Sequence, residues 1–220
     1  MPLIIFDLDG TVLDTREDLC DAVNFGLDAC GFPKRSCEEV VSFVGNGVRK
    51  LVERALPEGE KSAENIEKVN NLFNEYYSVH YADKTRPYDG MSELLEKLKN
   101  ACCRLVVFSN KPDEFSKGLI ERFYHGIFDQ TIGSREGFPK KPDPNVELEI
   151  MKHFGVSQNA TLHIGDSDTD IMTAKNAGVR SIGVCWGYRS KESLISAGAS
   201  EVAENLDMLY CEIMSWLKMI

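Results

Sequence analysis

The chain has 220 residues, of which 43% are hydrophobic and 27% are charged, so it can bury a core and disorder is not expected. Its 35 acidic residues outnumber its 25 basic ones, and the net charge of −10 argues against a protein that coats nucleic acid. No apolar run approaches the roughly 20 residues that span a bilayer, and no basic leader precedes the first apolar run at residues 3–6. The seven cysteines are irregularly spaced and include no Cys-x-x-Cys pair. We therefore expect a cytoplasmic protein with reduced thiols that binds neither a membrane nor nucleic acid.

The first part of the chain predicts one strand followed by a long helical segment. Residues 3–6 are a short apolar run that ends in acidic residues and a glycine, which is typical of a buried strand entering a loop. Helical patterns follow over 15–29, from the capping box at 36–39 to the glycines at 45–47, and over 48–56 and 62–81. Because this stretch contains no convincing strand, we interpret residues 15–85 as a helical domain inserted after the first strand.

The second part of the chain alternates strands with helices. Strand patterns lie at 104–108, more weakly at 127–132, and at 161–164 and 179–184. Helical patterns lie at 91–100, 113–124, 144–154, 169–177 and 206–218. This alternation predicts an α/β fold with a mostly parallel sheet covered on both faces. In such folds the active site lies outside the carboxyl ends of the strands.

Two carboxylates follow the first predicted strand, in the sequence Asp7-Leu8-Asp9-Gly10-Thr11. Like charges placed this close together cost energy unless a cation lies between them. The backbone amides of Gly10 and Thr11 and the threonine hydroxyl could also bind an anion. An ordinary acidic turn is the alternative, but the position at a strand end favours a metal site or an acid–base site.

Three aspartates alternate after the predicted strand 161–164, namely Asp166, Asp168 and Asp170. Their spacing resembles a calcium loop, but Ile171 stands where that loop requires glycine. Asp166 follows the strand directly and can face the same cleft as the first pair of aspartates. Ligands made only of oxygen favour a hard cation, and Mg²⁺ suits a phosphate substrate. Asp168 is better explained as an acidic residue in the first turn of the next helix.

Two further segments are candidates for binding an anion. Ser109 and Asn110 follow the predicted strand 104–108, where their side chains and the first N–H groups of a helix could hold a phosphoryl group. An ordinary helix cap is the alternative. Lys141 precedes Pro142, whose restricted backbone could help to aim the ammonium group, although an ordinary surface lysine is an equally simple interpretation.

Four segments in this order resemble the signatures of the haloacid-dehalogenase-like hydrolase superfamily. They are Asp7-Leu8-Asp9-Gly10-Thr11, Ser109-Asn110, Lys141-Pro142 and Gly165-Asp166 with Asp170. Residues 183–190 and Ala197-Gly198-Ala199 further resemble its phosphoglycolate phosphatase branch. The resemblance implies a Rossmann-like core, residues 1–14 and 86–220, and an inserted α-helical cap, residues 15–85.

The resemblance also implies a Mg²⁺-dependent phosphatase that acts on a small phosphorylated metabolite. Asp7 would be the nucleophile that forms an aspartyl-phosphate, and Asp9 would protonate the leaving alcohol and then activate water. The Mg²⁺ ligands would be Asp7, the backbone carbonyl of Asp9 and Asp166, with Asp170 acting from a second layer or through water.

The remaining roles concern the phosphoryl group. Ser109, Asn110 and Lys141 would hold its oxygens, and Lys141 would also anchor Asp7. Thr11, counted among the substrate-binding residues, would support the loop that carries Asp9. An aspartate at position 9 argues against the metal-free dehalogenases and the phosphonate-cleaving branch. A β-phosphoglucomutase-like phosphoryl-transfer enzyme remains an alternative, as does a non-catalytic binding module on the same fold.

Substrate choice is assigned to the helical insert, because the core recognises only a phosphoryl group. Gly45-Asn46-Gly47 precede a predicted helix whose first turn carries Arg49. Exposed amides and a guanidinium could bind a carboxylate, so a small carboxylated phosphoester such as 2-phosphoglycolate is the expected substrate. A solvated Arg49 beside a helix cap is an equally weighted alternative.

Overall fold

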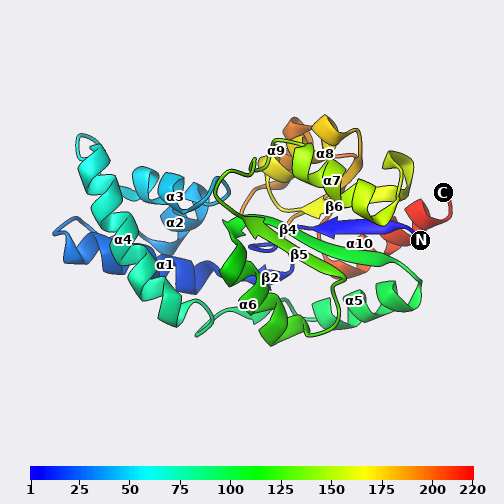
Figure 1. Cartoon of the computed structure of the whole chain (residues 1–220), viewed down its shortest axis with the longest axis horizontal. Coiled ribbons are helices and arrows are strands. Elements are labelled where there is room, and N and C mark those ends of the chain that lie inside the picture. The colour runs from blue at the N-terminus through cyan, green and yellow to red at the C-terminus, as the bar shows by residue number, and fades with distance from the viewer. The chain divides into compact units, whose positions relative to one another are not determined.

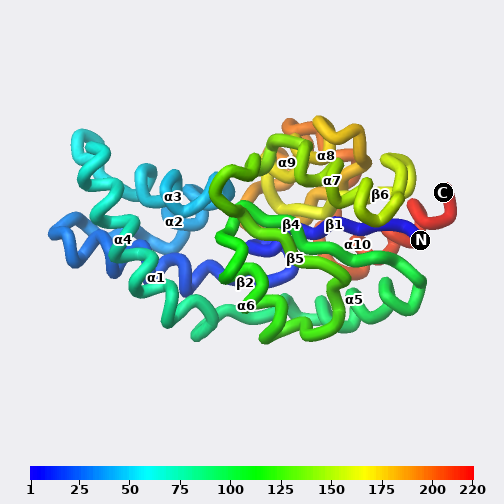
Figure 2. Tube along the Cα trace, viewed as in Figure 1, coloured from blue at the N-terminus to red at the C-terminus, as the bar shows by residue number.

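The computed structural model describes all residues, 1–220, and divides into two compact units. The first contains Met1–Leu13 and Pro87–Ile220, and the second contains Asp14–Arg86. Figure 2 shows how the chain leaves the first unit early and returns to it before the helix α5 (Met91–Asn100). The sequence predicts an insert over residues 15–85, so each boundary lies one residue from the predicted one.

The first unit is built on a six-stranded sheet in which every neighbouring pair is parallel (Figure 1). In spatial order the strands are β5 (Gln130–Ser134), β4 (Arg104–Pro112), β1 (Leu3–Phe6), β6 (Thr161–Gly165), β7 (Arg180–Val184) and β8 (Glu201–Ala203). The order reverses at β1, because the chain adds β4 and β5 on one side and β6 to β8 on the other. The predicted Rossmann-like α/β fold is thus confirmed, and β1 lies at its topological switch point.

Helices cover both faces of this sheet. Besides α5 they are α6 (Asp113–Tyr124), α7 (Asn145–Phe154), α8 (Asp168–Ala177), α9 (Lys191–Ala197) and α10 (Leu206–Leu217), with a short 3₁₀ helix at Gln158–Ala160. On one face, Leu3 and Ile5 of β1 lie in a buried apolar cluster with Ile150 of α7 and Ala174 of α8. Figure 1 shows α5 and α6 on the other side of the sheet.

The second unit is helical. Its helices are α1 (Arg16–Ala29), α2 (Cys37–Phe43), α3 (Val48–Ala55) and α4 (Ala63–His80). The predicted capping box opens α2, because the Ser36 hydroxyl accepts from the Glu39 N–H and the Glu39 carboxylate accepts from the Ser36 N–H. The buried Asp18 on α1 accepts hydrogen bonds from the N–H groups of Lys84 and Thr85 and from the Thr85 hydroxyl, which fastens the end of this unit to its beginning.

Several short elements lie outside what the sequence predicts. The strands β2 (Leu13–Asp14) and β3 (Arg86–Pro87) pair with each other where the chain passes between the units. The helix α9 and the strand β8 are likewise unpredicted, because seven and three residues carry too little periodicity. None of the helices is both long and apolar enough to cross a membrane.

Candidate active site

The first candidate residues follow the carboxyl end of β1. The N–H of Asp7 donates to the carbonyl of Ile164 on β6 at 2.8 Å, so the parallel ladder extends one residue beyond the strand. The chain then turns sharply, because the Leu8 carbonyl accepts from the N–H groups of residues 11–13. Asp7 is therefore buried at the centre of the sheet edge, where the switch-point geometry places a ligand site.

Lys141 lies between two of the predicted aspartates. Its buried ammonium donates to Asp7 Oδ1 at 2.7 Å and to Asp170 Oδ1 at 2.5 Å. Asn110 fixes the lysine backbone, since its Nδ2 donates to the Lys141 carbonyl at 3.0 Å and its Oδ1 accepts from the Lys141 N–H at 2.9 Å. The Asn110 amide thus positions Lys141, a role the sequence did not suggest, while its expected contact with a phosphoryl group stays a prediction.

Asp166 is held by the two loops that face it. Its Oδ1 accepts from the hydroxyl of the fully buried Thr11 at 3.2 Å, and its Oδ2 accepts from the Tyr188 N–H at 2.6 Å. Both loops come so close that only glycine fits, because a Cβ on Gly10 or Gly187 would overlap the Asp166 carboxylate. Thr11 therefore orients an aspartate of the site, whereas its predicted contact with substrate stays a prediction.

One carboxylate oxygen of Asp170 caps a helix, and the other contacts Lys141. Oδ2 accepts from the N–H and the hydroxyl of Ser167, and the Ser167 hydroxyl accepts from the Asp170 N–H, which forms a capping box at the start of α8. Oδ1 faces Lys141. Asp7, Asp166 and Asp170 each offer one oxygen, and these atoms lie within 4.8 Å of one another.

This donor set suits a hard divalent cation. The three buried candidate ligands are all carboxylates, and Mg²⁺ prefers such hard oxygen ligands to softer nitrogen or sulfur ligands. Burial, with Asp170 and Asp9 nearby, raises the pKa of Asp7 to about 6 although Lys141 opposes the shift. Burial and the charges of Asp7 and Asp170 raise the pKa of Asp166 well above its ordinary value. Burial is the largest cause of both shifts, and a cation bound among these carboxylates would oppose them.

The pKa values of Asp170 and Lys141 are shifted in the directions that favour the charged forms. Burial disfavours both charges, but Lys141 and His163 hold the pKa of Asp170 well below its usual range. In the same way Asp170 and Asp7 keep the pKa of Lys141 above its usual value despite burial. The lysine therefore stays a cation at the site, fixed between two carboxylates.

Asp9 has a partner that sequence reasoning missed. The ammonium of Lys111 donates to Asp9 Oδ1 at 3.0 Å, and the Lys111 side chain is buried. The Lys111 N–H donates to Ser109 Oγ at 3.2 Å, and both residues lie in the last part of β4. The sequence places Lys111 directly after the predicted Ser109-Asn110 pair. It does not show that Lys111 contacts Asp9, because the two residues lie 102 positions apart.

A buried histidine lies behind Asp170. His163 Nε2 is 3.7 Å from Asp170 Oδ1, and its Nδ1 is 2.9 Å from Oε2 of Glu147. Burial lowers the pKa of His163, but Glu147 and Asp170 outweigh this and raise it to about 9. The ring lies among carboxylates beneath the site, and these favour its cationic form.

Arg49 belongs to the second unit. It is exposed in the first turn of α3, which begins after Gly47. The neighbouring Lys50 pairs with Glu53 at 2.8 Å. Arg54, which the sequence did not single out, donates to the Phe43 carbonyl and so braces the loop before α3. The predicted contact between Arg49 and a carboxylate stays a prediction.

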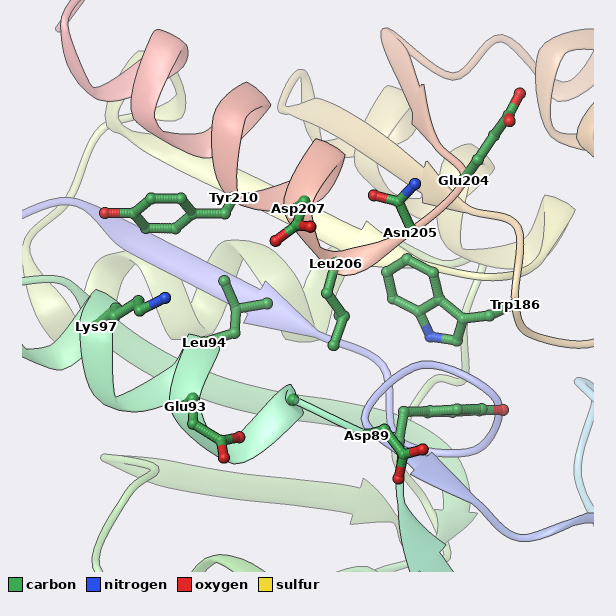
Figure 3. Close-up of a pocket in the computed structure, with 12 residues that line it drawn as sticks. Asp89, Glu93, Leu94, Lys97, Trp186, Glu204, Asn205, Leu206, Asp207 and Tyr210 are labelled. Atoms are coloured by element: carbon green, nitrogen blue, oxygen red, sulfur yellow. The ribbon is translucent and has the colours of Figure 1, made fainter.

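A separate cavity of about 590 Å³ lies in the first unit (Figure 3). Its lining includes the aromatic residues Tyr88, Trp186 and Tyr210 and several acidic residues. None of the site's aspartates lines it. Its link to the site is Trp186, whose indole N–H donates to the Thr11 carbonyl at 3.1 Å.

Comparison with known proteins identifies the family of this chain. The chain matches the haloacid dehalogenase-like hydrolase family over residues 4–184. It is 34% identical over 214 residues to phosphoglycolate phosphatase of Psychrobacter arcticus, covering 94% of this chain and 93% of that protein. The corresponding values for phosphoglycolate phosphatase of Vibrio parahaemolyticus are 35% over 216 residues, 94% and 93%. A solved structure from Lactobacillus delbrueckii subsp. bulgaricus superposes with a TM-score of 0.91 at 32% identity, covering 97% of this chain and 99% of that one. The chain therefore belongs to the haloacid dehalogenase-like hydrolase family, within its phosphoglycolate phosphatase-like branch.

Proposed function

We propose that this phosphoric monoester hydrolase cleaves a small phosphomonoester through an aspartyl-phosphate on Asp7, with Mg²⁺ as cofactor. One observation carries the proposal. At the switch point of the sheet, Lys141 Nζ contacts the oxygens of both Asp7 and Asp170, and Asp166 lies in the same carboxylate cluster. This arrangement combines a nucleophile, a fixed cation and a set of oxygen ligands, which phosphoryl transfer requires.

In the first step a carboxylate oxygen of Asp7 attacks the phosphorus atom, and the bond between phosphorus and the ester oxygen breaks. The electron pair of that bond leaves with the alcohol oxygen, which takes a proton from the Asp9 carboxyl group. Lys111, 3.0 Å from Asp9 Oδ1, holds that carboxyl group in position. The products of this step are the free alcohol and the Asp7 aspartyl-phosphate.

In the second step Asp9, now ionised, accepts a proton from a water molecule that attacks the phosphorus atom. The bond between phosphorus and the Asp7 oxygen breaks, and its electron pair returns to the Asp7 carboxylate. Inorganic phosphate leaves, and Asp9 regains its proton for the next cycle. Lys141 balances the Asp7 carboxylate before and after the reaction.

The phosphoryl oxygens are held by Ser109, Asn110 and Lys141 in this proposal. Asp7, Asp166 and the Asp9 carbonyl would bind Mg²⁺, with Asp170 acting through water. When bound, Mg²⁺ offsets the repulsion between the Asp7 carboxylate and a phosphate dianion.

We propose 2-phosphoglycolate as the substrate, with Arg49 binding its carboxylate. The support is the exposed guanidinium next to the N-terminus of α3, together with relatives that are named phosphoglycolate phosphatase. A guanidinium pairs well with a planar carboxylate, so a phosphoester without this group would be a poorer substrate.

The proposal is tested by measuring phosphate release from a panel of metabolite phosphoesters and an aryl phosphate, with Mg²⁺ and with a chelator. We expect Mg²⁺-dependent release from several esters and the highest kcat/KM with 2-phosphoglycolate. Isomerisation of a sugar phosphate with little free phosphate would indicate a mutase instead. The absence of any turnover on the panel would indicate a binding module.

A further inference from the structure

A buried histidine and a buried glutamate lie side by side in the apolar layer beneath the active site. His163 is in the middle of β6 and Glu147 is in the first turn of α7, and both side chains are 0% exposed. His163 Nδ1 and Glu147 Oε2 are 2.9 Å apart, which is hydrogen-bond distance. The Glu147 carboxylate therefore fixes the orientation of the imidazole ring.

The apolar surroundings of this pair do not suggest that it stabilises the fold. His163 pairs in register with Ile5 of β1, and α7 contributes Val146 and Ile150 to the apolar cluster on this face. Burying two polar, ionisable side chains costs free energy, and hydrocarbon side chains of similar size usually give equal or higher stability. A contact with something other than the core is needed to account for the pair.

The other edge of the ring provides that contact. His163 Nε2 has no hydrogen-bond partner and lies 3.7 Å from Asp170 Oδ1. That oxygen accepts from Lys141 Nζ at 2.5 Å, and Lys141 Nζ donates to Asp7 Oδ1 at 2.7 Å. The side chains of Glu147, His163, Asp170, Lys141 and Asp7 thus follow one another in a continuous row.

We propose that His163, oriented by Glu147, is a positioning residue that holds the Asp170 carboxylate on Lys141 and thereby sets the Lys141 ammonium against Asp7. The proposal rests on the function proposed above, in which Lys141 and Asp7 act on the phosphoryl group. The other Asp170 oxygen is committed to the cap of α8, so the histidine acts on the one oxygen that faces the site. Neither His163 nor Glu147 touches the substrate, and both act through Asp170.

The test compares two near-isosteric replacements, Glu147→Gln and Glu147→Met. The amide oxygen of Gln can still accept from Nδ1, whereas Met cannot orient the ring. We expect Glu147→Gln to keep kcat within about 3-fold of the wild type, and Glu147→Met to lower kcat by about 10- to 100-fold, the usual effect of losing an outer orienting group. KM changes little in both variants, because the substrate contacts are intact. Equal kcat values for the two variants would overturn the proposal.

A double variant, Glu147→Leu with His163→Leu, separates positioning from packing. We expect thermal stability equal to or above that of the wild type together with a reduced kcat. The control is Ile150→Val, on the same helix and in the same apolar layer, which should lower stability while kcat stays unchanged. A stable double variant with wild-type kcat would refute positioning by His163.

Crystal structures of the wild type and of Glu147→Met separate this proposal from the proposed function. We expect the Lys141 ammonium to move away from Asp7 in the variant. If the wild type releases no phosphate from any ester, the proposed function fails, and these structures still decide the positioning role. A Lys141 ammonium that keeps its contacts with Asp7 and Asp170 in Glu147→Met would overturn it.

Discussion

Asp7 is buried among other acids, and its environment disfavours the charge that the proposed chemistry needs. Burial and the neighbouring Asp170 and Asp9 raise its pKa to about 6, and only Lys141 opposes them directly. A nucleophile held in this way gains from any added positive charge, whether from Lys141 or from a cation. The same repulsion means that the carboxylate does not stabilise the fold.

The substitution Asp7→Asn should therefore abolish turnover without harming folding. Asn has nearly the same shape but cannot form the acyl phosphate, so we expect kcat to fall by at least about 10³-fold. Removal of one of several like charges should leave the melting temperature equal or higher. Phosphate release and thermal unfolding of the same preparation measure both effects, and normal activity would refute the assignment of the nucleophile.

The Lys111→Met variant tests the proposed acid–base role of Asp9 by removing its ammonium partner. Asp9 loses the ammonium that holds its carboxyl group, and misplacement of a catalytic group costs up to about 100-fold in kcat. The loss should be larger for an alkyl phosphate than for an aryl phosphate, whose leaving group needs less protonation. Lys117→Met is the control, because Lys117 is an exposed lysine paired with Asp113. Equal losses for both substrates would remove Asp9 as the target of Lys111.

Individual residues differed in how far sequence could predict them. Asp7 and Asp9 were accessible because two acids directly after an apolar strand repel each other, and a bound cation or a shared proton relieves that repulsion. Lys111 and His163 were not, since each depends on a partner more than 15 residues away, Asp9 and Glu147 respectively. A histidine inside an apolar strand is interpreted as a core residue until the side chain across from it is known.

At the scale of elements, the backbone of the loop between β7 and α9 approaches the Asp166 carboxylate closely at Gly187. A Cβ on Gly187 would overlap the Asp166 carboxylate, so Gly187→Ala must displace the loop or the carboxylate. We expect a kcat about 10-fold lower or worse and a higher half-saturating Mg²⁺ concentration. Ser190→Ala in the same loop removes the N-cap of α9 without touching Asp166, so it should cost only about 1 kcal/mol of stability. An unchanged Mg²⁺ dependence in Gly187→Ala would contradict this role.

The helix α3 carries the proposed determinant of substrate choice. Arg49→Ala should raise KM for 2-phosphoglycolate by about 10-fold or more, the value of a hydrogen bond to a charged group, with little change for an aryl phosphate. Lys50→Ala is the matched control, because Lys50 is adjacent, exposed and paired with Glu53. If both substrates suffer equally, Arg49 does not bind the carboxylate.

For the whole molecule, the link between protonation and cation binding gives a test that needs no turnover. The folded-state pKa of Asp7 lies above its ordinary value of 3.8, at about 6, so the folded protein binds this proton more tightly than the unfolded chain. Its contribution to stability is therefore present below pH 3.8 and is lost as the pH rises through about 6. The pKa of Asp166 is shifted in the same direction.

Mg²⁺ should accordingly raise the melting temperature more at about pH 7.5 than at about pH 5, because its ligands must be ionised to bind it. Thermal unfolding with Mg²⁺ and with a chelator at the two pH values measures the difference. The double variant Asp7→Asn with Asp166→Asn is the control and should respond at neither pH. The same gain at both pH values would argue against a cation among these carboxylates.

The architecture was the most predictable level of all. Regular alternation of apolar strands and amphipathic helices implies a parallel sheet, and its interruption over residues 15–85 marks the insert. Strand order and the short pairs β2–β3 and β7–β8 were beyond reach, because they depend on contacts between distant segments and not on local periodicity.

The pairing of β2 with β3 has an evolutionary consequence. Adjacent strands lie about 4.8 Å apart, so the outgoing and returning chains stand next to each other at the junction. An insert whose two ends meet in this way can be lengthened, shortened or exchanged by recombination while the six-stranded sheet keeps its register. A lineage built on this plan can acquire a new inserted unit and keep the chemistry of its sheet unit unchanged.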